Sequence, residues 1–156
     1  MQMKAGQNMF RGNSFHNLDT KGRLIIPTRF RDVLKQSSVN GLMVSKMDGS
    51  VFCYTVEEWR KIEERILNLA VKGENMRRFR RIFIGGAFDC LPDKQGRIVI
   101  PPVLRQYAGL DREVVLIGVL DHFEIWSQEK WLKEDAKFQN DLKKEDMRNE
   151  VAALGL

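Results

Sequence analysis

Two short stretches of the chain place the same three residues at the same spacing. They read Asp19-x-x-Gly22-Arg23 and Asp93-x-x-Gly96-Arg97. An aspartate that opens a turn accepts backbone N–H bonds, and a glycine adopts the backbone conformation that other residues resist. An arginine at the mouth of the next strand can pair with a phosphate or read guanine O6 and N7. The alternative is that each arginine merely bridges back to the aspartate of its own turn.

Each turn also carries a lysine. Lys21 precedes the first glycine, whereas Lys94 follows the second aspartate. Both are candidate phosphate contacts, which would position a nucleic acid without specifying its sequence. Arg29 and Arg31 flank a short helix and are interpreted as exposed salt-bridging residues. The cluster at 77–81 is interpreted as a solvated helix face, with phosphate contact or subunit pairing left open for Arg77, Arg78, Arg80 and Arg81.

Charge is distributed unevenly along the 156 residues, whose net charge is +5. Residues 1–78 hold 14 basic and 8 acidic side chains, and residues 79–156 hold 12 and 13. A basic face on a small protein indicates a polyanionic partner, most often nucleic acid. A merely solvated basic face is the competing interpretation.

The two turns belong to an internal repeat. Residues 19–31 and 93–105 align with six identical positions in thirteen, including the Ile-Pro pair that follows each turn. The similarity continues upstream, between 10–18 and 83–91, and downstream, between 54–59 and 126–131. This pattern is typical of a duplicated unit.

Each unit predicts a strand, a turn, a strand, a short helix and a pair of strands. The strands are expected at 14–18, 23–26, 42–45 and 51–54, and again at 87–91, 97–100, 114–119 and 123–126. Pro27 and Pro101 open the short helices, and Gly109 ends the second. Thr55-x-x-Glu58 is a capping box for a helix that runs to Gly73.

Further helices are expected after each unit. One covers residues 75–83, and Ser127 caps the last, whose thin apolar stripe predicts a tail that frays or packs on a neighbour. A β-rich unit of about 45 residues is marginal alone because it buries little surface. The sequence therefore predicts an α+β fold in which duplicated ββαββ units interlock in one pseudo-symmetric β-barrel with flanking helices.

The segment Met9-Phe10-Arg11-Gly12, followed by the two turns with their Ile-Pro extensions, resembles the MraZ family of bacterial transcriptional regulators over residues 9–131. The resemblance implies two AbrB-like swapped-hairpin units per chain and assembly into closed homo-oligomeric rings. It also implies binding to direct repeats of double-stranded DNA in the promoter of the family's own division and cell-wall gene cluster, with repression as the expected outcome.

The resemblance adds Arg11 as a fifth candidate DNA contact, beside the lysine and arginine of each turn. The aspartates and glycines of the turns are then structural. We expect an N-terminal extension, a first unit, a helical connector, a second unit and a helical tail, at residues 1–8, 9–60, 61–82, 83–131 and 132–156.

No pattern for catalysis or metal binding emerges from the sequence. His16 and His122 lie in strand-like segments without a nucleophile motif, and Cys53 and Cys90 form no metal-binding spacing. We expect no enzyme, no cofactor, no metal and no small-molecule substrate. The absence of a long apolar run or a signal peptide predicts a cytoplasmic protein with no membrane partner. The resemblance to a family of DNA-binding regulators further implies association with the nucleoid.

Two other functions stay open. One is an oligomeric interaction protein, against which the basic first half argues. The other is an antitoxin-like DNA binder of the AbrB fold, although such chains usually carry one unit and a disordered tail.

Overall fold

The computed structural model describes residues 9–37, 40–70 and 73–156, so the expected extension at 1–8 lies outside the described residues. In chain order the elements are β1 (Phe10–Asn17), β2 (Arg23–Ile25), α1 (Thr28–Lys35), β3 (Leu42–Met47), β4 (Ser50–Thr55), α2 (Val56–Asn68), α3 (Glu74–Phe79), the π-helical turn η1 (Arg80–Ile84), β5 (Phe88–Cys90), β6 (Arg97–Val99), α4 (Pro102–Ala108), β7 (Glu113–Leu120), β8 (Phe123–Ser127), α5 (Gln128–Asp141) and α6 (Glu145–Ala152). This is the α+β composition that the sequence predicts.

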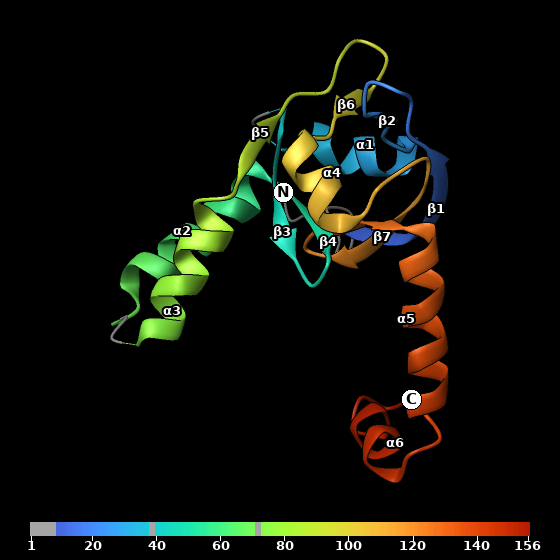
Figure 1. Ribbon diagram of the computed structural model, residues 1–156. Coiled ribbons are helices and arrows are strands. Elements are labelled where there is room, and N and C mark those ends of the chain that lie inside the picture. The colour runs from blue at the N-terminus through green and yellow to red at the C-terminus, as the bar shows by residue number, and fades with distance from the viewer. Residues whose placement is uncertain (1–8, 38–39, 71–72) are drawn as a thin grey trace.

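The hydrogen-bonded ladders cross between the two repeated units. β1 pairs antiparallel with β7 along its whole length, from Phe10 opposite Leu120 to Asn17 opposite Glu113. β5 pairs with β3, and β2 pairs with β6. The result is one large sheet of order β1-β7-β8-β4-β3-β5 and a two-stranded sheet β2-β6 (Figure 1).

The expected closed barrel is not formed by these ladders. Within the described residues the large sheet is open, with β1 and β5 as its edges. The segment before β5 folds as α3 and η1, at the place where the sequence predicts a helix over residues 75–83, although the repeat aligns Phe83 with Phe10 of β1. The N–H of Gly85 donates to the carbonyl of Arg80 at 3.3 Å, which widens the last turn. β5 is therefore only three residues long and offers too short an edge to close the sheet.

Most helices begin or end at the capping residues that the sequence predicts. The Thr55 hydroxyl accepts the N–H of Glu58 at 3.2 Å, and the Ser127 hydroxyl accepts the N–H of Lys130 at 3.1 Å. Gly109 ends α4 with a φ of 65°. By contrast, α2 stops at Asn68 and not at Gly73, because Leu69 adopts an extended backbone conformation, and the side chains of Leu67 and Leu69 are exposed.

The largest hydrophobic core cluster joins both units. The rings of Phe10, Phe30 and Phe123 contact one another with centroids 5.0–5.3 Å apart. Phe10 in β1 and Phe30 in α1 belong to the first unit, whereas Phe123 in β8 belongs to the second. All three side chains are buried. Neither unit therefore completes this core without the other.

The elements distribute to two ends of the molecule. In Figure 1 the loops that carry both motif turns lie at the top with β2 and β6, and α2–α3 and α5–α6 project from the opposite end. Of the helices that the structure describes, none is long and apolar enough to cross a membrane. The end with the motif turns and the end with the projecting helices can therefore contact different partners.

Candidate nucleic-acid interface

The first turn is organised around the carboxylate of Asp19. Its Oδ1 accepts the N–H of Lys21 at 2.9 Å and the N–H of Arg23 at 2.8 Å, while Oδ2 pairs with Nε of Arg23. The N–H of Gly22 donates to the carbonyl of Asp19 at 3.0 Å, and Gly22 has a φ of 77°. These bonds fix the turn and start β2 at Arg23.

The second turn repeats this geometry. Asp93 Oδ1 accepts the N–H groups of Gln95 and Arg97, each at 2.9 Å, and Oδ2 accepts Nε of Arg97 at 2.9 Å. Gly96 has a φ of 75°. In both turns the arginine is therefore paired with its aspartate through Nε. Its Nη atoms make no hydrogen bond within the described part of the chain, so that edge of the guanidinium remains available to a ligand.

The two arginines share one face of the β2–β6 ribbon. Arg23 lies opposite Val99, and Ile25 lies opposite Arg97. Side chains directly opposite one another in an antiparallel pair point to the same face. Leu24 and Ile98 occupy the other face and are buried, whereas Ile25 and Val99 are 54% and 53% exposed. The ribbon therefore presents an arginine at each diagonal end, with two apolar side chains between them.

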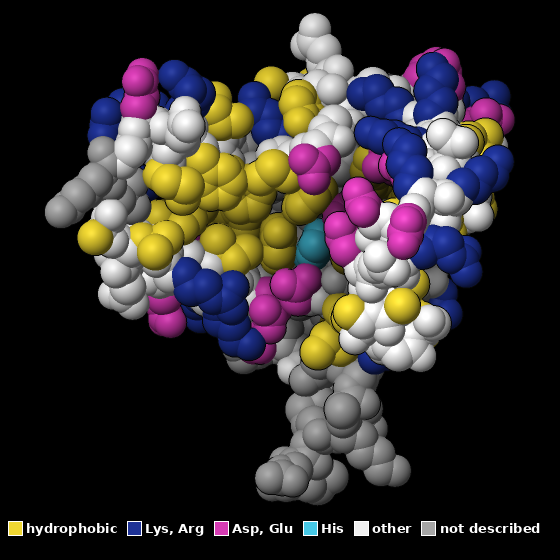
Figure 2. Space-filling model, turned by 90° about the horizontal axis from the view of Figure 1, so that it is seen from below, with side chains coloured by type: hydrophobic (Ala, Val, Ile, Leu, Met, Phe, Trp, Pro, Cys, Tyr) yellow, Lys and Arg dark blue, Asp and Glu magenta, His cyan; other side chains and the backbone are white. Residues whose placement is uncertain are grey.

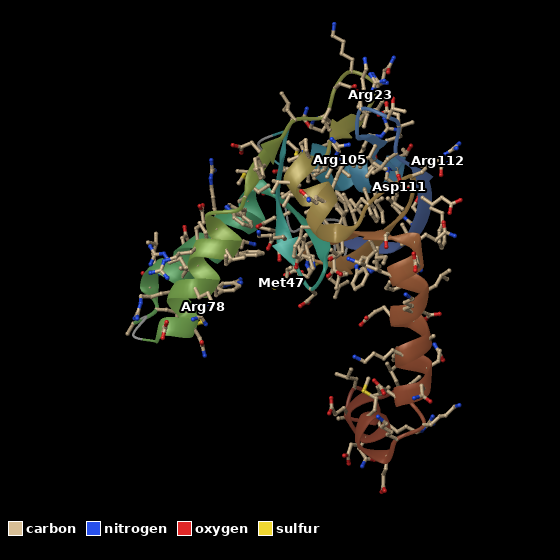
Figure 3. The ribbon with its side chains drawn as sticks, viewed as in Figure 1. Arg23, Met47, Arg78, Arg105, Asp111 and Arg112 are labelled. Atoms are coloured by element: carbon tan, nitrogen blue, oxygen red, sulfur yellow. The ribbon has the colours of Figure 1, made fainter. Side chains whose placement is uncertain are left out.

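Arginines from the opposite unit lie against the two glycines. A β-carbon placed on Gly22 would lie 2.6 Å from Cζ of Arg105, and one placed on Gly96 would lie 2.8 Å from Cδ of Arg31. Arg105 donates through Nε to the carbonyl of Ile100 at 3.1 Å, next to the ribbon. Figure 3 shows Arg105 on α4 beneath the loop that carries Arg23. Each turn is thus braced by the helix of the other unit.

Sequence reasoning missed these braces. The interpretation of Arg31 as an exposed salt-bridging residue is wrong, because its guanidinium is partly buried and donates to the Thr28 hydroxyl at 3.0 Å. Arg105 is absent from the sequence-based candidates. The sequence did contain a signal for these two residues, because Arg31 and Arg105 occupy equivalent positions of the repeat and are identical.

The other candidate contacts lie at different distances from the ribbon. Lys21 and Lys94 are exposed on their turns, beside the arginines. Arg11 lies near the opposite end of β1, where it pairs with Val119. Leu18 follows Arg11 by seven positions, which corresponds to about 23 Å along an extended strand. The structure therefore brings four of the five candidates together and leaves Arg11 apart.

Comparison with known proteins gives a family for this arrangement. The model described as "MraZ protein, putative antitoxin-like" matches the chain twice, at residues 9–82 and 83–151. The chain belongs to the MraZ family. It is 52% identical over 148 residues to "Transcriptional regulator MraZ" of Desulforapulum autotrophicum, covering 95% of this chain and all of the relative. The protein of the same name from Desulfosudis oleivorans is 51% identical with the same coverage, and that from Thioalkalivibrio sulfidiphilus is 40% identical over 94% of this chain and 96% of its own.

The electrostatics of the turns differ from those of isolated aspartates. The backbone N–H of Arg23 lowers the pKa of Asp19, and the Arg23 side chain and the N–H of Lys21 add to the effect against a smaller opposing contribution from burial. The N–H of Arg97, its side chain and the N–H of Gln95 act likewise on the pKa of Asp93. In this member of the MraZ family both turn carboxylates are therefore charged at neutral pH.

We expect both aspartates to titrate below the ordinary pKa value of 3.8. A pKa that is lower in the folded state stabilises the fold above the unfolded-state value, and this stabilisation is lost as the pH falls through the folded-state value. The turns should thus stay intact to below about pH 4. Carboxyl ¹³C shifts followed by NMR during acid titration measure the midpoints. Midpoints at or above 3.8 would contradict the turn geometry.

Outside the turns, the described residues hold another group of paired charges. The His122 ring bonds to Asp121 and Glu124, both at 2.8 Å, and it stacks on Phe52 and Tyr54. Burial acts to lower the pKa of His122, but the two hydrogen bonds and the carboxylate charges outweigh it and the pKa is raised. No group of three His, Cys, Asp or Glu suited to a metal ion is found among the residues that the structure describes.

Proposed function

We propose that this chain is a sequence-specific, DNA-binding transcriptional regulator. Its site is the outward face of the β2–β6 ribbon, and its target is a set of tandem direct repeats in the promoter of its own division and cell-wall gene cluster, where it acts as a repressor. The observation that carries the proposal is the pair of braced turns, which place Arg23 and Arg97 at the two diagonal ends of one ribbon. The regulator name of its relatives supports the same function.

The ribbon has dimensions that suit the major groove of DNA. This groove admits a two-stranded antiparallel ribbon. Residues two steps apart on paired strands are separated by about 8 Å, which corresponds to two or three base-pair steps. Arg23 and Arg97 can each present two N–H groups to guanine, while Ile25 and Val99 can contact thymine methyl groups. Lys21 and Lys94 then reach the phosphates on either side.

The ion pair within each turn is compatible with this role. An exposed pair of this kind contributes little to stability, so exchanging it for a base or phosphate costs little. Because the aspartate holds Nε, the guanidinium is already oriented when DNA arrives. The carboxylate therefore acts as a positioning group for the arginine. Pairing with the aspartate through Nε and contact with DNA through the Nη atoms are then compatible with each other.

The crossing ladders support the interlock of two swapped-hairpin units, at 9–60 and 83–131, that the resemblance implies. Several copies assembled in a closed ring would present identical ribbons at regular intervals. Contacts that are weak singly then act together on tandem repeats. Arg11 contributes a phosphate contact outside the ribbon.

Binding to DNA from upstream of the chain's own gene tests the proposal. Affinity measured by fluorescence anisotropy should rise with the number of repeats. It should also fall by orders of magnitude between about 50 and 200 mM salt if six or more phosphates are neutralised. A flat salt response would show that the basic turns are not the contact surface.

A shuffled duplex of the same length and composition is the control. Equal affinity for the shuffled and natural sequences would exclude a sequence-specific regulator and favour an oligomeric interaction protein. Equal affinity for one repeat and for several would exclude the cooperative use of several ribbons.

A further inference from the structure

Two helices at the C-terminal end have little support from the rest of the described chain. α5 and α6, both described in full, bury no side chain. Near the start of α5, Trp131 contacts Trp126 of the body at 5.9 Å between ring centroids. Helices of 14 and 8 residues are marginal in water unless an apolar face is covered. They project from the body in Figure 1, and their apolar side chains are left at least partly exposed by the described part of the chain.

The surface that needs covering lies in the bend between α5 and α6. A hollow of about 380 Å³ is lined there by Trp131, Glu134, Asp135, Lys137, Phe138, Asp141 and Met147. Phe138, at its centre along α5, is 39% exposed. The rim carries three carboxylates and one ammonium group, so the hollow combines an apolar floor with negative charge. We call it the tail hollow.

A complementary surface projects from the other side of the same molecule. The segment Glu74–Ile84, formed by α3 and η1, carries exposed apolar side chains at Met76 and Ile82, and Ile82 is 50% exposed. Four arginines surround them, at positions 77, 78, 80 and 81, against one acidic residue, Glu74. Arg78 bonds to Glu74 and Asn75 of its own helix, at 3.3 and 3.2 Å. We call this segment the arm tip.

The inner side of the arm is also apolar. Trp59, Tyr54 and Phe83 form a cluster against which Met43, Met47, Phe52 and Phe79 pack with part of their surface exposed. Figure 2 shows hydrophobic side chains gathered in one broad field on this face of the molecule, bordered by basic and acidic groups. A contiguous exposed apolar surface is typical of a protein–protein contact.

We propose that the arm tip of one copy docks in the tail hollow of a neighbouring copy of the same chain. This inference rests on the assembly described under the proposed function and names the surfaces that make it. The arginines of the arm tip face the carboxylates of the tail hollow, and Ile82 with Met76 covers Phe138 and Met147. Because the two surfaces differ, the contact is head-to-tail, and repetition of such a contact closes a ring when the rotation permits.

This contact leaves the DNA-binding face free. Figure 3 shows Arg78 on the arm and Arg23 at the opposite end of the molecule. Every copy in the ring would therefore present its β2–β6 ribbon with the same orientation. The proposal also assigns the basic cluster at 77–81 to subunit pairing, one of the roles that the sequence leaves open.

Charge reversal on each side tests the contact. The arm variant combines Arg78→Glu and Arg81→Glu, and the tail variant combines Glu134→Lys and Asp135→Lys. Each variant alone sets like charges against each other and should fall to a lower mass by native mass spectrometry without DNA. An equimolar mixture should regain the mass of the wild-type assembly, because each reversed surface then meets an opposite charge. Arg60→Glu, an exposed change on α2, is the matched control and should keep the wild-type mass.

Either of two results overturns the proposal: wild-type mass for both variants alone, or a mixture that stays at the lower mass. Recovery on mixing also shows that both variants are folded. The DNA-binding proposal fails separately, if an assembled wild-type ring does not discriminate its own promoter from shuffled DNA.

Discussion

Arg23→Ala is expected to weaken operator binding by at least about 1 kcal/mol, because alanine cannot donate the hydrogen bonds that the guanidinium makes to guanine. The effect should exceed that of Arg97→Ala, because Lys21 stands beside Arg23 and the first half of the chain holds the excess of positive charge. On tandem repeats every engaged copy carries the substitution, so the effects accumulate. Fluorescence anisotropy on the tandem operator at one fixed salt concentration measures both variants.

The interpretation depends on intact folding of the variants. The side chains of Arg23 and Arg97 are about one-third exposed in their ion pairs, so both variants should keep the wild-type mass and thermal melt. Loss of folding in Arg23→Ala would mean that the pair with Asp19 is structural. If Arg97→Ala loses more affinity for DNA than Arg23→Ala while its fold stays intact, local charge does not determine which turn contributes more to DNA binding.

Much of the local structure could be predicted because it depends on residues close in sequence. Thr55 and Ser127 cap the helices that follow them, and Gly109 ends α4 in the left-handed conformation. The aspartate, glycine and arginine of each turn also lie within five residues of one another. Short-range hydrogen bonds of this kind form wherever the same residues recur, which is why the repeat identifies both turns.

The two repeated units differ in structure at one equivalent position, where the sequence predicts a helix over residues 75–83. Phe10 and Phe83 are equivalent in sequence, yet Phe10 lies in β1 and Phe83 in η1. The ring of Phe83 contacts Trp59 on α2 and Phe79 on α3, and these contacts favour a helix over a strand. Equivalent positions of the repeat therefore adopt different structures here. The sheet is open, and the predicted closed barrel does not form.

The same distinction applies to the candidate interface. The turns were visible in the sequence, but the braces by Arg31 and Arg105 connect residues of different units across the core. Arg11 was close to the first turn in sequence only, because an extended strand carries it to the far end of β1. Which residues share a surface depended on how β1 pairs with β7 and β2 with β6, and those pairings join residues between 72 and 110 positions apart.

The ring contacts of Phe123 lead to the largest stability prediction. Its side chain is fully buried and packs on Phe10 and Phe30 of the other unit. Phe123→Ala should therefore destabilise the chain by about 3–5 kcal/mol, because it removes apolar burial and leaves a cavity. Chemical denaturation measures the loss in the free energy of unfolding. Hydrogen exchange shows which strands lose protection.

The exchange pattern distinguishes one core from two. If both units share the core, the amide protons of β1 in the first unit and β8 in the second should lose protection together, in a single transition. Leu67→Ala on α2 is the control, since Leu67 is 69% exposed and its removal should change the free energy of unfolding by less than about 0.5 kcal/mol. Two separate transitions in Phe123→Ala, with the first turn and its binding of DNA retained, would instead show that the units fold independently. The contacts of Arg31 and Arg105 with the turns of the opposite units would then not link the stability of the two turns. Each turn would be stabilised by residues of its own unit.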